Sequence, residues 1–417
     1  MKIERPQYLN RILESRHNGM IKIITVVRRS GKSYLLFNIF SEWLKNNGND
    51  DSHIIKIDLE DRRNSKLRDP DILLDYIDSR MKDNKMYYIL IDEIQLVPEF
   101  EDVLNSYLKI ENADVYVTGS NARFLSKDVI TTFRGRGEEI KVFPLSFKEY
   151  MSVSQQGVEL GFEEYITYGG LPQVIQYNST ERKIQYLKSL FAETYLTDIK
   201  ERYEIRNDEE LEILLDILSS SIGSLTNPIN LANTFESEKK IKLSDKTIKL
   251  YIDYIRDSFL IDKVQRYDIK GKKYIGTPSK YYFVDPGLRN ARLNMRQLDK
   301  GHLMENVIYN ELCIRGYNVD VGVVPTIVRD KNGKQKRVSY EIDFVCNKGN
   351  QKYYIQSAYR MDSEDKIKQE ENSLRNVDDS FKKIVIVGRP ILVERDNNGI
   401  TRISIYDFLL NENSLEL

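Results

Sequence analysis

Residues 24 to 33 read ITVVRRSGKS, and this short stretch decides how the first part of the chain is expected to fold. From Val26 onward it matches the phosphate-binding loop G-x-x-x-x-G-K-[ST] at every fixed position except the first, where valine replaces glycine. The motif is meaningful only between a strand and a helix. Apolar residues 21–27 precede the loop and the amphipathic stretch 33–46 follows it. The context therefore favours a phosphate-binding loop over the alternative, an ordinary turn.

The fixed residues of this loop have the chemistry that a nucleoside triphosphate requires. Gly31 lets the backbone approach phosphate oxygens, Lys32 reaches the β and γ phosphates, and Ser33 is suited to ligate Mg²⁺. We therefore predict ATP and Mg²⁺ as the cofactors. The predicted binding segment consists of Val27, Arg28, Arg29, Ser30, Gly31, Lys32, Ser33 and Tyr34.

Valine at the first loop position has two interpretations. If the loop turns there with a positive φ angle, the β-branched side chain costs roughly 1–2 kcal/mol and weakens ATP binding about tenfold. If the loop instead begins from extended backbone at Val26, no strain arises. Either interpretation leaves a working site, because the residues expected to touch phosphate and metal are intact.

A second motif, YYILIDEIQ at residues 87–95, ends an apolar strand in two carboxylates. Buried carboxylates are costly unless something pairs with them. Asp92 is predicted to hold Mg²⁺ together with Ser33, and Glu93 to orient and deprotonate the attacking water. The alternative is a strand end that enters solvent.

Polar residues after the next apolar strand extend this set. In VTGSNARFL, Ser120 or Asn121 is predicted to contact the γ-phosphate or the water. In TTFRGRGEEI, Arg134 and Arg136 are candidates for a charge-stabilising arginine finger or a substrate-contacting loop, and solvated surface arginines are an equal alternative. Whether they act within one chain or across a subunit boundary is left open. The predicted catalytic residues are Glu93, Ser120, Asn121, Arg134 and Arg136.

The wider pattern predicts an α/β protein with three domains. Apolar strands expected at 21–27, 53–59, 86–92 and 113–119 alternate with helical segments in residues 1–150, which indicates a parallel sheet. Residues 151–295 are mainly helical, and a helix beginning after Ser244 is followed by a hairpin with Gly271 at its tip, the outline of a winged helix. Residues 296–417 return to mixed α/β sequence.

Composition limits the classes of function. Hydrophobic residues make up 41% and charged residues 30%, a globular balance, and the net charge of -1 gives no global attraction to polyanions. Cys313 and Cys346 are the two cysteines, so neither a disulfide framework nor a zinc site is expected. No apolar run suits a signal segment or a membrane span, and we expect a cytoplasmic protein.

Two basic hairpins are the remaining functional signal. Residues 266–274 and 329–337 are rich in lysine and arginine, and the first also carries Tyr267 and Tyr274. Such hairpins suit phosphate contacts and base stacking, so DNA is a candidate partner. Lysine-rich tips that serve solubility and protect sheet edges are an equal alternative.

The order of motifs resembles the prokaryotic AAA-type ATPases that carry a C-terminal domain of unknown function. The resemblance covers nearly the whole chain and rests on the stretches ITVVRRSGKSYLL, ILIDEIQ, VTGSNA, RGRGEEIKVFPLSFKEY, YGGLPQVI and KYYFVDPGLRNA. It implies a P-loop AAA+ ATPase domain at 1–150, a helical lid and winged helix at 151–295, and a restriction-endonuclease-like α/β domain of the PD-(D/E)xK type at 296–417. It also implies nucleotide binding by Gly31, Lys32, Ser33 and Asp92, with Glu93 catalytic.

The nuclease-like part departs from the family pattern. Glu305 and Asp343 are well placed, but the next strand has Gln356 and Ala358 where an active site has a carboxylate and a lysine. Phosphodiester hydrolysis needs carboxylates to hold the cation and a lysine to position water. We therefore expect an inactive domain that is structural or docks DNA.

Three functions follow as hypotheses. The leading one is an ATP-binding protein that hydrolyses Mg-ATP as a conformational switch acting on a partner, with DNA as a candidate. The alternatives are a nucleic-acid-binding module with residual ATPase activity and a Mg²⁺-dependent nuclease. A homo-oligomer is left open.

Overall fold

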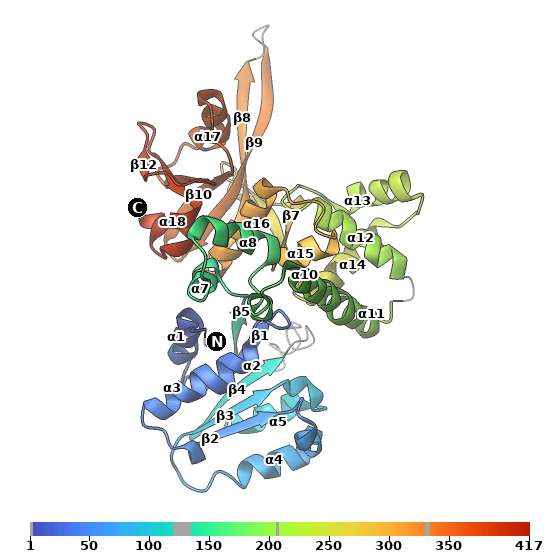
Figure 1. The fold of residues 1–417 in the computed structure, drawn as a ribbon, viewed down its shortest axis with the longest axis vertical. Helices are drawn as coiled ribbons and strands as arrows, with labels where there is room; N and C mark the ends of the chain where they lie inside the picture. Colours follow the sequence, from blue (N-terminus) through green and yellow to red (C-terminus); the bar gives the residue numbers. More distant parts are fainter. Residues whose placement is uncertain (1–2, 120–134, 206–207, 330–333) are drawn as a thin grey trace. The chain divides into compact units, whose positions relative to one another are not determined.

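A computed structural model describes residues 3–119, 135–205, 208–329 and 334–417, which form two compact units (Figure 1). The first unit comprises residues 1–144 and the second residues 145–417. None of the helices in the described ranges is both long enough and apolar enough to span a membrane.

The first unit is built on a parallel five-stranded sheet, as the alternating pattern predicts. Its strand order is β2-β3-β4-β1-β5, so β1, which leads into the loop, lies between β4 and β5. The strands are β1 (Ile21–Val26), β2 (Ile54–Asp58), β3 (Tyr87–Asp92), β4 (Ala113–Gly119) and β5 (Gly137–Val142). Every residue of β3 is buried, because helices cover both faces of a parallel sheet.

Two layers of helices cover the two faces of this sheet. On one face, α1 and the helix that follows the loop pack against the sheet, with Leu36, Phe40 and Leu44 fully buried. On the other face, α4 and α5 bury Leu73, Ile77 and their neighbours. The helical segments are α1 (Pro6–Glu14), α2 (Lys32–Tyr34), the π-helical η1 (Leu35–Phe40), α3 (Ser41–Asn46), α4 (Pro70–Asp78) and α5 (Phe100–Tyr107).

The second unit begins with a helical region. Within it, the predicted helix after Ser244 forms, and the Ser244 side chain accepts the Thr247 N–H at 3.1 Å as an N-cap. The helices of this region are α7 (Phe147–Met151), α8 (Val158–Tyr168), α9 (Pro172–Ile175), α10 (Thr180–Ser189), the π-helical η6 (Leu190–Leu196), α11 (Thr197–Arg202), α12 (Asp208–Ser220), α13 (Pro228–Thr234), α14 (Asp245–Asp257) and α15 (Pro286–Arg292).

The rest of the second unit is organised by a mixed eight-stranded sheet in the order β12-β13-β11-β10-β9-β8-β6-β7. Its strands are β6 (Ile261–Asp268), β7 (Lys273–Phe283), β8 (Asn318–Arg329), β9 (Gln335–Lys348), β10 (Gln351–Ala358), β11 (Lys382–Val387), β12 (Glu394–Arg395) and β13 (Ile400–Ser404). Helices α16 (Lys300–Ile314), α17 (Glu364–Arg375) and α18 (Ile405–Leu410) complete it. Figure 1 shows β8 and β9 extending as an arm beyond the other strands of this sheet.

This sheet draws strands from both of the ranges predicted for the second and third domains. The ranges 151–295 and 296–417 belong to one compact unit, because the β6–β7 hairpin joins the later strands through the parallel pair of β6 with β8. The boundary between the two compact units lies after residue 144, near the predicted boundary at 150. Local sequence gave no sign that a hairpin from the middle of the chain would complete the C-terminal sheet.

Two motifs that carried the family resemblance meet inside the second unit. The Asp285 carboxylate of KYYFVDPGLRNA accepts the N–H groups of Gly170 at 2.8 Å and Leu288 at 3.0 Å. Gly169 has φ 79°, and a Cβ at that position would overlap the Asp285 carboxylate. The glycines of YGGLP are therefore needed because the backbone packs closely against the Asp285 carboxylate. These two motifs thus have a structural role.

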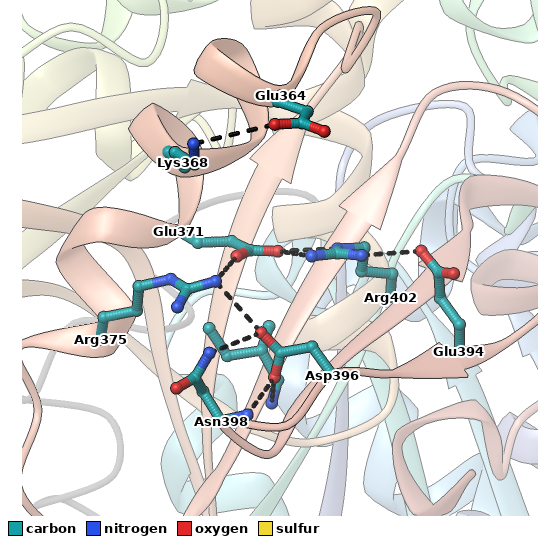
Figure 2. A network of polar contacts seen from close by, with 9 residues as sticks. Glu364, Lys368, Glu371, Arg375, Glu394, Asp396, Asn398 and Arg402 are labelled. Atoms are coloured by element: carbon teal, nitrogen blue, oxygen red, sulfur yellow. Dashed lines mark hydrogen bonds and ion pairs between the residues drawn. The ribbon is translucent and has the colours of Figure 1, made fainter.

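Figure 2 shows a polar network that fastens α17 to the sheet. The fully buried Glu371 carboxylate accepts hydrogen bonds from Arg375 at 2.6 Å and from the Arg402 Nε at 2.7 Å. Arg402 also pairs with Glu394 at 2.8 Å, and Arg375 pairs with Asp396 at 3.2 Å. Two guanidinium groups thus compensate one buried carboxylate.

Candidate functional site

The loop of ITVVRRSGKS starts from extended backbone. Val26 is the last residue of β1 and pairs with Val142 of β5. The positive φ angles of the loop fall at Arg29 (66°) and at Gly31 (90°). The strain considered for valine at the first loop position therefore does not arise, since the left-handed turn lies three residues later.

Arg5 holds this loop from within the first unit. Its guanidinium is buried and donates to the Ser30 carbonyl at 2.9 Å and to the Phe143 carbonyl at 2.8 Å. The Ser30 side chain is also fully buried, and its hydroxyl has no hydrogen-bond partner among the described residues. Protein contacts therefore define the loop conformation, and the Ser30 hydroxyl is an exception to the usual pairing of buried polar groups.

The loop that follows β1 and the end of β3 bring four predicted residues together. The Ser33 hydroxyl donates to the Asp92 carboxylate at 2.6 Å, and the Lys32 ammonium contacts the Glu93 carboxylate. This convergence follows from topology, because the carboxyl ends of the parallel strands β1, β3 and β4 meet at the same edge of the sheet. Lys32, Asp92 and Glu93 are all buried.

Asp92 lies in an environment that raises its pKa. Burial is the largest cause, and hydrogen bonds from the Ser33 and Thr118 hydroxyls partly oppose it. Both hydroxyls contact the carboxylate, one on each oxygen. The pair of oxygen ligands Ser33 and Asp92 has the hard-donor chemistry that Mg²⁺ prefers.

Glu93 is held in a special geometry. Its backbone is left-handed, with φ 55°, and its N–H donates to the Thr118 hydroxyl at 3.2 Å. Besides Lys32, the Gln95 side chain contacts its carboxylate through the second oxygen. Left-handed backbone at a non-glycine residue is costly and persists where surrounding contacts impose it, often at functional sites.

Thr118, Gln95 and Arg5 are contacts that the sequence patterns did not predict. Thr118 belongs to the stretch VTGSNARFL. The prediction there concerned the polar residues after the strand and not the hydroxyl within the strand. A signal was available in strand register, because Ile91 pairs with Val117 and the following residues, Asp92 and Thr118, are therefore neighbours. Gln95 and Arg5 act through tertiary contacts that carry no local signature.

The remaining residues of the predicted site have different placements. Val27 is buried, Arg28 is half-buried, and Arg29 is exposed. Tyr34 is 38% exposed on the helix after the loop. Three further candidates, Ser120, Asn121 and Arg134, lie outside the described residues.

Arg136 lies away from the loop of its own chain. It immediately precedes β5, and its carbonyl accepts the N–H of Ile21, the first residue of β1. The loop follows the other end of β1. At about 3.3 Å per residue, roughly 16 Å of strand separates the two positions. The side chain is exposed at the opposite edge of the sheet.

The predicted pair of carboxylates in the C-terminal sequence also comes together. Glu305 on α16 and Asp343 on β9 are both buried, and both contact the Lys280 ammonium, at 2.9 Å and 3.1 Å. Gln356 lies nearby and accepts the Asp343 N–H at 3.4 Å, while Ala358 is part of the hydrophobic core. The contact from Lys280 was not predicted.

The two basic hairpins differ in their environment. At the β6–β7 tip, Lys270 pairs with Asp378 at 3.3 Å, and Tyr274 packs edge-on against Tyr267 while donating to Asp320 at 3.2 Å. Those tyrosines are therefore engaged within the protein. On the β8–β9 arm, the described basic residues are Arg329, Lys334, Lys336 and Arg337, all exposed.

Comparison with known proteins places this site in a family context. The profile of the AAA domain family matches residues 18–151, and profiles of two domains of unknown function match residues 159–299 and 300–408. An uncharacterized protein of Haemophilus influenzae is 33% identical over 414 residues, 98% of each chain. An uncharacterized protein of Methanocaldococcus jannaschii is 28% identical, over 90% of this chain and 86% of its own. The Aeropyrum pernix Orc1 protein, solved in complex with DNA, has a TM-score of 0.30 at 13% identity, covering 70% of this chain and 93% of that one.

Proposed function

The chain belongs to the family of AAA-domain proteins that includes its Haemophilus influenzae relative, and we propose that it binds Mg-ATP at residues 27–34 and hydrolyses it. The observation that carries this proposal is the meeting of Lys32, Ser33, Asp92 and Glu93 at one edge of the parallel sheet. An ammonium, a hydroxyl and two carboxylates at a glycine-containing loop are the groups that triphosphate hydrolysis requires.

The residues present fit both parts of the ligand. Gly31 begins the helix with a left-handed backbone, so N–H groups of the loop are free of side-chain obstruction, and the buried Ser30 hydroxyl lacks a partner among the described residues. Ser33 and Asp92 would hold Mg²⁺. When bound, Mg²⁺ would neutralise phosphate charge beside Lys32.

The chain's own groups suggest how turnover is controlled. Lys32 and Glu93 are paired with each other, so neither can serve a substrate in this arrangement. Phosphate oxygens compete with Glu93 for the Lys32 ammonium, and the released carboxylate is then able to accept a proton from the attacking water. Gln95 and Thr118 keep Glu93 in place during this exchange.

ATP binding to a Lys32→Ala variant tests the proposal. We expect the dissociation constant to rise about tenfold to a hundredfold, because a hydrogen bond to a charged group contributes about 1.5–3 kcal/mol. Lys45→Ala is the matched control, since Lys45 lies on the continuing helix with its side chain exposed and paired to Asp51. An unchanged dissociation constant for Lys32→Ala, measured by calorimetric titration, would remove the proposal.

Arg136 lies at the opposite edge of its own sheet, so we propose that it can serve as an arginine finger only in the site of a second copy, the alternative being an ordinary surface arginine. Lys32→Ala and Arg136→Ala should each lose turnover alone. Mixed together, they should regain part of it, since the first variant donates Arg136 to the intact site of the second. Wild-type turnover by Arg136→Ala alone would exclude this role.

Nucleic-acid binding is the second candidate function, favoured by the β8–β9 arm. The described residues 325–329 and 334–339 pair only with each other among the strands and include four basic side chains and no acidic one. A two-stranded ribbon fits the major groove of DNA, and basic side chains supply phosphate contacts. The order α12, α13, α14, β6 and β7, with the bridge between Thr226 and Ser279, supports a winged helix beside the arm.

Duplex binding measured over a salt series separates this candidate from the first. We expect binding to weaken steeply with salt and to survive Lys32→Ala. Replacing Arg329, Lys336 and Arg337 by serine should reduce both the affinity and the salt dependence. Absence of duplex binding at low salt would exclude the candidate.

A further inference from the structure

Lys280 is the most buried charged group of the C-terminal carboxylate centre. Its side chain is 3% exposed, and its ammonium lies 2.8 Å from Glu341, 2.9 Å from Glu305 and 3.1 Å from Asp343. Tyr282 donates its hydroxyl to the same Glu305 oxygen at 2.6 Å. One ammonium therefore touches three carboxylates in a place that is largely withdrawn from water.

Electrostatics shows why the lysine is needed there. Burial, together with the nearby Asp343, raises the pKa of Glu305 to about 7, although Lys280 opposes this. Burial alone would lower the pKa of Lys280, but the surrounding acidic groups outweigh it and hold that pKa well above its ordinary value. Without a positive charge, at least two buried carboxylates would repel each other, which is a strongly unfavourable arrangement.

The lysine approaches from an element that a nuclease-like pattern does not use for this purpose. Glu305 comes from α16 and Asp343 from β9, while the two positions of β10 that would complete an active site hold Gln356 and Ala358. Lys280 instead comes from β7, which is separated from β9 by β8 and β6 in the sheet. Its ammonium contacts all three carboxylates, so none of them is left unpaired for a cation.

We infer that the Lys280 ammonium takes the place of a divalent cation in this centre, so that the native chain holds Glu305, Glu341 and Asp343 together without metal. Across the described ranges, no group of three or more His, Cys, Asp or Glu side chains is arranged to hold a metal ion, so a cation would bind a variant without Lys280 only after the three carboxylates shift toward the vacated position. Removing the ammonium leaves carboxylate oxygens, which are the ligands that Mg²⁺ and Mn²⁺ prefer. Lys280→Ala should therefore unmask a divalent-cation site, and the native centre should not cleave phosphodiesters.

Calorimetric titration with Mn²⁺ tests the inference on the full chain. All proteins carry Asp92→Asn, which removes the candidate Mg²⁺ ligand of the first unit and keeps the outcome separate from the ATP proposal. We expect Lys280→Ala to bind one Mn²⁺ at least about tenfold more tightly than the Lys280 parent. Adding Asp343→Asn should abolish that binding, and Lys272→Ala, at the exposed tip of the same hairpin, should behave like the parent.

Two results would overturn the inference: a parent protein that binds Mn²⁺ in a manner that Asp343→Asn abolishes, or a folded Lys280→Ala variant that binds none. If Lys280→Ala does not fold even with Mn²⁺, the combination of Lys280→Met with Glu305→Gln, Glu341→Gln and Asp343→Asn, which removes all four charges, decides. Folding of that combination shows that the lysine compensates charge, and its failure to fold refutes this.

Discussion

Replacing Asp285 by asparagine tests the buried contact between the YGGLP and DPGLRN motifs. The Asp285 side chain is fully buried, and burial raises its pKa from 3.8 to about 6, against the opposing hydrogen bonds from Gly170 and Leu288. Because the pKa is raised in the folded state, the protonated form favours folding. Its contribution is fully present below pH 3.8 and is lost as the pH rises through about 6.

The size of this effect on the free energy of unfolding follows from the difference between the two pKa values of Asp285. The difference between 3.8 and about 6 corresponds to about 3 kcal/mol of unfolding free energy. Asparagine cannot ionise, but it has one oxygen where the carboxylate uses two, so Asp285→Asn also loses one hydrogen bond at every pH. Losing this hydrogen bond costs about 1–3 kcal/mol, which lowers the free energy of unfolding of Asp285→Asn by the same amount at every pH.

Urea denaturation between pH 4 and pH 7, followed by circular dichroism, measures the effect. Relative to wild type, Asp285→Asn should gain about 2 kcal/mol of unfolding free energy between pH 4 and pH 7, whatever its constant cost, because part of the full effect is already lost at pH 4. Asp365→Asn, at an exposed position of α17, serves as the control. A difference between Asp285→Asn and wild type that does not change with pH would refute the reasoning.

Further changes should have distinct effects. Thr118→Val removes the hydroxyl that contacts Asp92, so ATP turnover should fall at least about tenfold with binding retained, whereas Thr118→Ser should stay near wild type. Val26→Gly, at a position of extended backbone, should leave ATP affinity unchanged in a binding titration. Arg29→Gly should stabilise the first unit by about 1 kcal/mol in thermal unfolding, because a left-handed non-glycine residue is strained. Glu371→Gln should lower the unfolding free energy of the second unit by about 3 kcal/mol in denaturant titration, since it leaves two arginines without their shared carboxylate.

The sequence predicted most of the first unit because its signals are local. Strands expected at 21–27, 53–59, 86–92 and 113–119 differ from β1 to β4 by a residue or two. Parallel strands buried on both faces give continuous apolar runs, and the chain has four of them in succession. Parallel topology then places the carboxyl ends of these strands together, so the sequence alone predicts that Ser33 and Asp92 meet.

What the sequence could not predict depends on contacts between distant segments. Lys280 lies in a strand read as part of a winged-helix hairpin, and nothing near it indicates that its ammonium would enter a centre built from α16 and β9. Arg136 was adjacent to the right strand, but the parallel pairing of β5 with β1 places it at the far edge of the sheet. In both cases the order and pairing of the strands decide where the side chain acts. Local periodicity in the sequence does not indicate either of them.

Glu93 is proposed to act as the base of an ATP hydrolase, and steady-state ATP turnover by Glu93→Gln measures that role. The amide keeps the size of the side chain but cannot accept a proton. We expect ATP binding to be retained and turnover to fall about a hundredfold or more. Glu60→Gln, at an exposed position after β2, is the control and should match wild type. Equal turnover rates for Glu93→Gln and wild type would contradict the account.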